Sequence, residues 1–300
     1  MMMIWSNTRF AAVLLCCCPV AFVSAQDEAP EAPVEKIEPL PWRTDYLEAL
    51  SEARDENKLL FLFFHHGPED RSRRAFETLT LVDSHVRELL RDFVVAKTPV
   101  DAKINVDGEE IPLLQHKAFQ AMQGRQGIAI VDMKHEGTEY YGRMVSAFPF
   151  SPGHYYSAAP TRVILELPAG TLTQRTMVYA VRTHPETPAS TNGNWNSFLA
   201  GQAQEHSNHQ AQTRIQGHQG FMERFHRIQA NLRGGPSASE VVAESWEGQT
   251  LVEAAKECVR SWRQSPSHWG AVRSFQEYFG YDMKKGPDGV WYATGIFAND

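Results

Sequence analysis

Residues 251–269 read LVEAAKECVRSWRQSPSHW and combine an amphipathic helix with a polar motif directly after it. Apolar residues recur at three- and four-residue intervals from Leu251 to Trp262, which places them along one face of a helix. Ser265 and Pro266 end this pattern, and we expect His268 to project from the loop that follows. The stretch therefore predicts a helix packed on a core, with an imidazole presented beyond its end.

The residues around this stretch predict a domain over 191–300. Strand-like segments run from Tyr278 to Met283 and from Val290 to Phe297, and the Gly- and Pro-containing residues 286–289 between them favour a β-hairpin. Helical spacing extends over Trp195 to Gln212. We therefore expect helices packed on a sheet in this part of the chain.

Helix and strand signals also alternate over residues 41–150. Leu59 to Phe64 is an unbroken apolar run, typical of a central strand buried on both faces. Helices are predicted at Tyr46–Ala53, Arg71–Leu81 and Leu113–Met122, and further strands at Phe93–Lys97, Ile128–Met133 and Tyr140–Val145. This alternation indicates an α/β fold, with a sheet covered by helices.

Residues 151–190 are predicted to connect the two domains. Ala158–Glu166 has the pattern of a short helix, and Met177–Arg182 that of a strand. The proline-containing segment His184–Pro188 predicts an extended connector.

The first residues predict an export signal. Arg9 precedes a mostly apolar run from Phe10 to Val23, and Ala25 supplies a small residue before a cut at Gln26. We therefore expect a signal peptide over residues 1–25 and a disordered linker rich in Pro and Glu over 26–40. The mature protein is then expected to be secreted or periplasmic, without a stable membrane span.

Cysteine content and charge narrow the function further. Signal cleavage removes Cys16, Cys17 and Cys18, so that Cys258 is left alone and no internal disulfide forms. Cys258 lies on the apolar face of its predicted helix, which favours a buried, inert thiol. The formal net charge of −7 argues against a nucleic-acid partner.

Residues 41–150 resemble the thioredoxin-like superfamily in the order of their helix and strand patterns. The redox members of that superfamily carry a Cys-x-x-Cys pair after the first core strand, but here the residues are His65 to Asp70, HHGPED. The proline that precedes a late strand in that family is also missing from QGRQGIAIVD, residues 123–132. Because thiol exchange requires a thiolate, we do not expect a disulfide oxidoreductase.

Residues 191–300 resemble the CAP superfamily, which comprises cysteine-rich secretory, antigen-five and plant pathogenesis-related proteins, in its bacterial, SCP-like form. The motifs that carry the resemblance are AQEHSNHQAQTRIQGHQGFMERFHRI (203–228), AESWEGQ (243–249), SWRQSPSHWGAV (261–272) and GVWYATGIF (289–297). The resemblance implies an α-β-α sandwich. It also implies a central cleft that holds two histidines and up to two acidic residues.

Matched to these motifs, the two family histidines fall on His218 and His268 and the glutamate falls on Glu244. The second acidic position falls on Ser265, so this cleft has one carboxylate fewer. Two imidazoles and a carboxylate are plausible ligands of Zn²⁺ or another divalent cation. If a metal binds, His218 and His268 are its candidate ligands. The alternative is a network of hydrogen bonds that organises a polar cleft and requires no metal.

Three functions remain open from the sequence. The resemblance implies a binding role, because members of the CAP superfamily bind sterols, lipids or protein partners and share no common enzyme activity. We accordingly expect an exported protein that binds a small molecule, a lipid or a cell-envelope component in the cleft. The alternatives are a hydrolase that depends on a metal or on a His/Glu pair, and a structural module that contacts other proteins.

Overall fold

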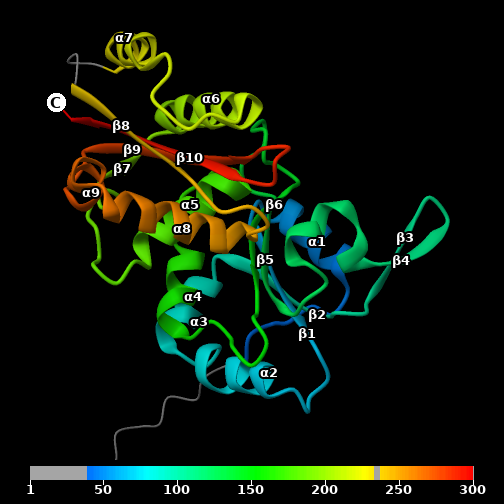
Figure 1. The fold of residues 1–300 in the computed structure, drawn as a ribbon. Coiled ribbons are helices and arrows are strands. Elements are labelled where there is room, and N and C mark those ends of the chain that lie inside the picture. Colours follow the sequence, from blue (N-terminus) through cyan, green and yellow to red (C-terminus); the bar gives the residue numbers. More distant parts are fainter. Residues whose placement is uncertain (1–38, 233–236, 300) are drawn as a thin grey trace, which may run out of the picture. The chain divides into compact units, whose positions relative to one another are not determined.

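The computed structural model describes residues 39–232 and 237–299, and these fold into helices and mixed sheets (Figure 1). The predicted α/β class is confirmed. The predicted signal peptide, its cleavage site and most of the linker lie outside the described residues. Residues 39–300 form one compact unit.

The first sheet contains β1 (Leu59–His65), β2 (Phe93–Pro99), β5 (Gly127–Asp132) and β6 (Met144–Pro149), in the order β2-β1-β5-β6. β1 runs parallel to β2 and antiparallel to β5. Successive side chains of β1 point to opposite faces, and both faces are covered by core residues. The prediction of a central, doubly buried strand at Leu59–Phe64 is therefore confirmed.

Helices cover this sheet at most of the predicted positions. They are α1 (Tyr46–Asp55), α2 (Arg71–Ala75), which continues as the π-helical turn η1 (Phe76–Thr80), and α3 (Ser84–Leu90), which was not predicted. The helix predicted over Leu113–Met122 forms as two 3₁₀ segments, η2 (Leu113–Gln115) and η3 (Lys117–Met122). A hairpin of β3 (Lys103–Val106) and β4 (Glu109–Pro112) was not predicted. The last strand begins at Met144 rather than at Tyr140.

The connecting residues contain two helices. α4 (Ala158–Leu165) agrees with the prediction, but Met177–Arg182 belongs to α5 (Leu172–Arg182) and is not a strand. Thr171 and Gln174 form a capping box at its start. Residues 174–181 are all buried, so this part of α5 has no exposed face, and its sequence does not show the polar side of an amphipathic helix. Its apolar run therefore looks like that of a buried strand.

The second sheet contains β7 (Asn194–Trp195), β8 (Ser237–Glu244), β9 (Tyr278–Lys285) and β10 (Trp291–Asn299), in the order β7-β9-β10-β8. β9 and β10 pair antiparallel, which confirms the predicted hairpin. β10 also pairs antiparallel with β8, a strand that was not predicted.

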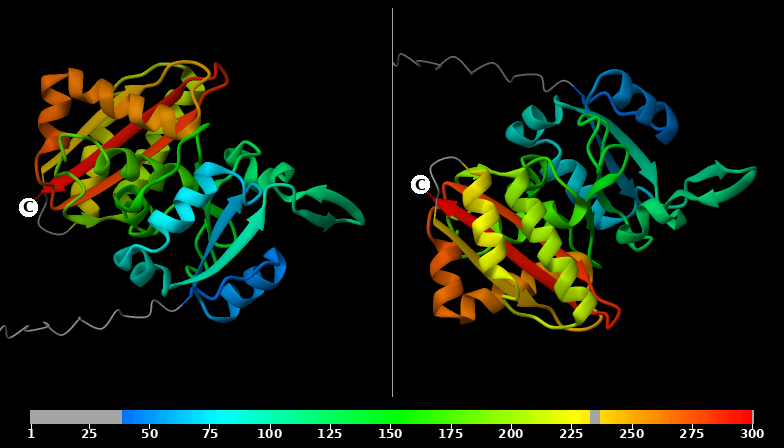
Figure 2. Two further views of the ribbon diagram at one scale, coloured as in Figure 1. Left: turned by 90° about the horizontal axis from the view of Figure 1, so that it is seen from below. Right: turned by 90° about the horizontal axis from the view of Figure 1, so that it is seen from above.

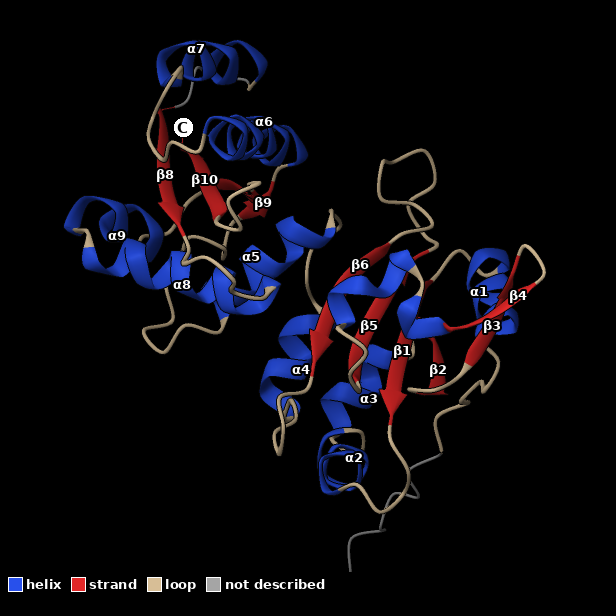
Figure 3. Ribbon diagram, turned by 45° about the vertical axis from the view of Figure 1, so that its right-hand side comes forward, coloured by secondary structure: helices blue, strands red, loops and turns tan. Residues whose placement is uncertain are grey.

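Helices lie on both faces of the second sheet (Figures 1 and 3). α6 (Ser197–Thr213) and α7 (Phe221–Asn231) lie side by side across one face, as the view from above shows (Figure 2). α5, α8 (Leu251–Gln264) and α9 (Pro266–Arg273) cover the other face. The approach of α6 is close, because a Cβ on Gly280 of β9 would clash with the backbone of Leu199 and Ala200.

The turn between α8 and α9 places the polar motif differently from the prediction. α8 is amphipathic as expected, with Leu251, Cys258 and Trp262 among its buried residues. His268, however, lies within α9 and not in a loop. Pro266 occupies the first turn of α9, where its fixed φ and missing N–H are tolerated, so it begins a new helix after ending the old one.

Candidate functional site

Two of the predicted site residues lie together. His218 precedes α7 and His268 lies in α9, and their Nε2 atoms are 3.4 Å apart. The ring centroids are separated by 5.6 Å. The His218 side chain is 45% exposed, so its free ring edge is open to solvent. The structure thus pairs two imidazoles that are 50 residues apart in sequence.

Hydrogen bonds fix the loop that carries His218. The Gly217 amide donates to Gln210 Oε1 over 3.1 Å, and the Gly217 carbonyl accepts from His206 Nε2 over 2.7 Å. Gly220 has a φ of 67°, a left-handed conformation that glycine adopts without strain, and it forms the N-cap of α7. α6 and α7 therefore hold this loop from both sides.

The carboxylate beneath the pair is Glu240, not Glu244. Glu240 Oε1 accepts from His218 Nδ1 over 2.9 Å, and its side chain is 1% exposed. Glu244 lies at the exposed end of the same strand, about 13 Å further along at the rise of a β-strand. A charged residue in the otherwise buried run of β8 was the signal that could have identified Glu240.

Arg224 of α7 neutralises the buried Glu240. Its Nε and one terminal nitrogen donate to the two carboxylate oxygens over 2.8 and 2.9 Å. The other terminal nitrogen donates to the Gln219 carbonyl over 2.7 Å. A bidentate pair of this kind fixes both side chains. The His218–Glu240–Arg224 network therefore holds the imidazole in one orientation.

This network also sets the tautomer of His218. Because a carboxylate only accepts, the hydrogen on His218 lies on Nδ1, and the neutral ring presents a bare Nε2 toward His268. Partial burial, followed by the neighbouring His218, lowers the pKa of His268 below its usual range.

Ser265, the remaining predicted cleft residue, forms no hydrogen bond with either histidine among the described residues. It forms the C-cap of α8 and the N-cap of α9, and its hydroxyl lies 3.3 Å from that of Ser267. Its backbone carbonyl accepts from the Trp269 amide over 2.8 Å. Ser265 therefore positions the helix that carries His268.

The spacing of the two Nε2 atoms fits a divalent cation as well as a hydrogen bond. Two nitrogens bound to one tetrahedral Zn²⁺ at about 2.0–2.1 Å are separated by about 3.3–3.4 Å. The Glu240 bond to Nδ1 is the outer contact that zinc-bound histidines commonly make. Within residues 39–232 and 237–299, however, no group of three or more His, Cys, Asp or Glu side chains is arranged to hold a metal. The pair alone would supply two protein ligands to such an ion.

The aromatic residues near the pair differ in exposure. Phe221 is partly buried and its ring centroid lies 6.5 Å from that of His218. Trp262 and Trp269 are buried in the core, whereas Trp246 at the end of β8 is 66% exposed. Phe221 is therefore the aromatic neighbour that a ligand on the histidines would meet.

The segment His65 to Asp70, which lies at the end of the first strand of the first sheet, has its own contacts. His65 ends β1, and its Nδ1 lies 2.9 Å from the His66 carbonyl. Asp70 caps α2 and accepts from the Gln126 amide group over 3.0 Å. The described residues contain one cysteine, Cys258, which is buried, and burial raises the pKa of its thiol. No thiolate is therefore presented near His65 by this part of the chain.

No family model matches this chain, and no curated protein matches it in sequence. Among the helices of the described residues, none combines the length and the apolar character needed to cross a membrane.

Proposed function

We propose that the protein is an extracytoplasmic binding protein that holds its ligand on the His218–His268 pair. The observation that carries the proposal is the pair itself: two ring nitrogens face each other at the surface, above a buried Glu240–Arg224 ion pair. Charged groups buried this deeply are costly unless they have a role or exact partners, and here they fix one imidazole. The CAP-like motifs and the signal-like N-terminus support the same proposal.

The ligand we propose is a small molecule, a lipid headgroup or a cell-envelope component that contacts the imidazole nitrogens. Phe221 provides an apolar neighbour beside them. The loop and both helices are fixed by the contacts described above, so the site is formed before the ligand arrives. A preformed site of this kind loses little conformational entropy on binding.

The His218–Glu240 bond favours one second candidate, a hydrolase. Glu240 orients His218 so that Nε2 is free to accept a proton, which is the arrangement of a general base. The attacking group would be water. Turnover of a panel of peptides and lipid esters would then fall at least about 100-fold in His218→Ala. Equal turnover by the variant rejects this candidate.

For the N-terminal domain we propose a scaffold without redox chemistry. His65 to Asp70 lie at the end of the first strand, where the redox members of the thioredoxin-like superfamily carry two cysteines. The parallel β1–β2 pair and the flanking antiparallel β5 support the thioredoxin-like interpretation. Insulin reduction in the presence of dithiothreitol should therefore proceed no faster with this protein than without it.

Native mass spectrometry of the exported protein tests the binding function. The wild type should retain a bound molecule that a variant with both His218→Ala and His268→Ala loses. His226→Ala, an exposed histidine on α7, is the matched control and should retain it. The same bound mass in the double variant, or no bound mass in the wild type, would contradict the proposal.

A further inference from the structure

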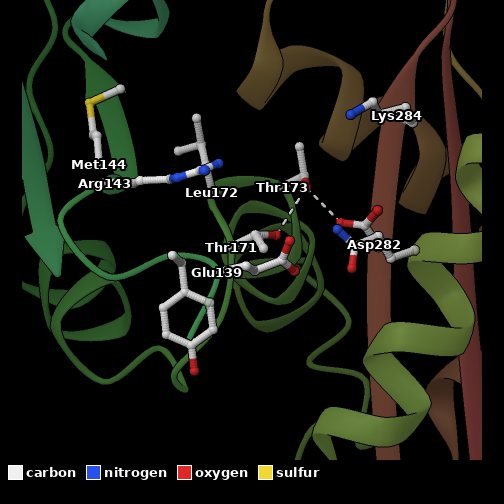
Figure 4. Close-up of a pocket in the computed structure, with 10 residues that line it drawn as sticks. Glu139, Arg143, Met144, Thr171, Leu172, Thr173, Asp282 and Lys284 are labelled. Carbon is white, nitrogen blue, oxygen red and sulfur yellow. Dashed lines mark hydrogen bonds between the residues drawn. The ribbon is translucent and has the colours of Figure 1, made fainter. Parts of the chain in front are cut away.

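A second polar pocket lies apart from the histidine pair, between β9, the start of α5 and the residues that precede β6 (Figure 4). Its volume is about 230 Å³. The charged residues that line it are Glu139, Arg143, Asp282 and Lys284, and two threonines, Thr171 and Thr173, lie between them. The pocket therefore offers charges of both signs within one small space.

Asp282 is the buried member of this group. Its residue is 1% exposed although it lines the pocket, and its Oδ1 accepts from the Thr173 hydroxyl over 2.6 Å. The Thr171 hydroxyl lies 3.2 Å from that of Thr173. Burial raises the pKa of Asp282 to about 7. Among the described residues no Lys or Arg forms an ion pair with Asp282, so a cation from outside can provide the missing countercharge.

The other charged side chains are also available. Within residues 39–232 and 237–299, Glu139, Arg143 and Lys284 form no ion pair. In Figure 4, Arg143 lies on one side of the two threonines, Asp282 and Lys284 lie on the other, and Glu139 lies beside Thr171. A ligand with a single charge would leave either the acidic or the basic side chains of the pocket without a partner of opposite charge.

We propose that this pocket binds a small zwitterion, a free amino acid or dipeptide, with its ammonium group on Asp282 and its carboxylate on Lys284. An ammonium group donates three hydrogen bonds, which match the Asp282 carboxylate, Glu139 and the threonine hydroxyl oxygens. The lysine nitrogen donates to the carboxylate in a charge-assisted bond.

The size of the pocket agrees with this ligand class. Pockets for drug-sized molecules measure about 300–1,000 Å³, so a smaller cavity selects a smaller molecule. The lining is polar and contains few apolar side chains, which disfavours a lipid tail. The site is independent of the proposed function, because none of its residues belongs to the His218–Glu240–His268 network.

Isothermal titration calorimetry with L-alanyl-L-alanine tests the proposal. At pH 8, where Asp282 is ionised, we expect saturable binding with a Kd below about 10 mM. The N-acetylated dipeptide lacks the ammonium group and the C-terminal amide lacks the carboxylate. Each should bind at least about tenfold more weakly, a difference of about 1.4 kcal/mol.

Variants connect the binding to the named residues. Asp282→Asn and Lys284→Gln should each weaken dipeptide binding by about tenfold or more. Lys285→Gln is the matched control, because Lys285 is the next residue of β9 but does not line the pocket, and its affinity should equal that of the wild type. His218→Ala should also bind the dipeptide normally, which separates this proposal from the function of the histidine pair.

Lys284 is exposed, so its substitution keeps the test valid if Asp282→Asn fails to fold. Circular dichroism checks the fold of each variant. Failure of the wild type to saturate at about 10 mM dipeptide would overturn the proposal. Equal binding of the N-acetylated form, or unchanged binding in Lys284→Gln, would overturn it as well.

Discussion

At the residue scale, Glu240 connects stability to the site. It is buried, it pairs with Arg224 through two hydrogen bonds, and it orients His218. Removing one member of a buried ion pair leaves the other charge without compensation. The same carboxylate therefore stabilises the fold and prepares the histidine pair.

Glu240→Gln should consequently reduce the free energy of unfolding by about 3–5 kcal/mol, because Arg224 keeps its charge in a buried position. Glu244→Gln, on the same strand but exposed, should change it by no more than about 0.5 kcal/mol. Urea denaturation of both variants measures the difference. Equal effects of the two substitutions would show that Glu240 is not the structural carboxylate.

Asp282 should make stability depend on pH. Its pKa is raised to about 7 in the folded protein, so the folded state holds the proton more tightly than the unfolded chain does. The stabilising contribution of the protonated acid is fully present below about pH 4 and is lost as the pH rises through about 7. The Thr173 hydroxyl donates to the ionised form and limits the shift.

Asparagine does not titrate, so Asp282→Asn lacks this pH-dependent contribution to stability. The variant should therefore gain stability relative to the wild type by up to about 4 kcal/mol between pH 4 and pH 8. Chemical denaturation of both proteins at several pH values provides the measurement. A stability difference that stays constant over this range would show that the Asp282 pKa is not raised.

The two carboxylates also show what sequence could predict at this scale. The histidines were identifiable because each lies in a distinctive motif, GHQGF for His218 and SPSHW for His268. The carboxylate was expected at Glu244 because that residue matches the glutamate of the CAP-family motif in AESWEGQ. The carboxylate that binds His218 is the one on the residue of β8 that lies opposite α7. Which residue that is depends on tertiary packing, which the sequence pattern does not show.

At the element scale, the second sheet depends on close contact with α6. The backbone of Leu199 and Ala200 occupies the space that a side chain at position 280 would need. Gly280→Ala should therefore cost about 1–3 kcal/mol of unfolding free energy, or more, because backbone must shift. Thermal denaturation should show a clearly lower Tm.

Gly270→Ala is the matched control for that substitution. Gly270 lies within α9, and a Cβ there meets no atom within 4 Å. Because alanine has a higher helix propensity than glycine, this variant should be more stable than the wild type by about 0.5–1 kcal/mol. A stabilising Gly280→Ala or a strongly destabilising Gly270→Ala would contradict the described packing of α6 and α9.

Helices with a clear period of apolar residues could be predicted from the sequence, whereas a helix buried on all sides could not. α8 carries one apolar stripe, and its helix was identified to within two residues at its C-terminal end. α5 is buried along most of its length, so its apolar run Met177–Arg182 was mistaken for a strand. The cap formed by Thr171 and Gln174 was the available signal, since a capping box marks a helix start.

At the scale of the whole molecule, the core should protect Cys258. The thiol lies on the buried face of α8, and burial raises its pKa above the usual range. In protein that lacks residues 1–25, a thiol reagent should therefore label Cys258 only when the chain unfolds. Rapid labelling under native conditions would show that α8 is not packed as described.

The α/β class could be predicted from the alternation of helix and strand patterns along the chain. Which distant segments come together to form a site could not. The pocket around Asp282 draws residues from the end of the first sheet, from α5 and from β9. Asp282 is a charged residue in a strand of mostly buried residues, the same signal as Glu240, but that signal does not show which segments pack against it. Sites built from distant segments require the packed structure to be seen.

The central claim is that Glu240 fixes the tautomer of His218 so that its Nε2 faces His268 as a binding site. Long-range ¹H–¹⁵N NMR of the imidazole rings, recorded during a titration with Zn²⁺, tests it most directly. We predict that His218 carries its hydrogen on Nδ1 and that the Nε2 signals of both histidines shift together as zinc is added. A His218 hydrogen on Nε2, or a shift confined to one ring, would contradict the claim.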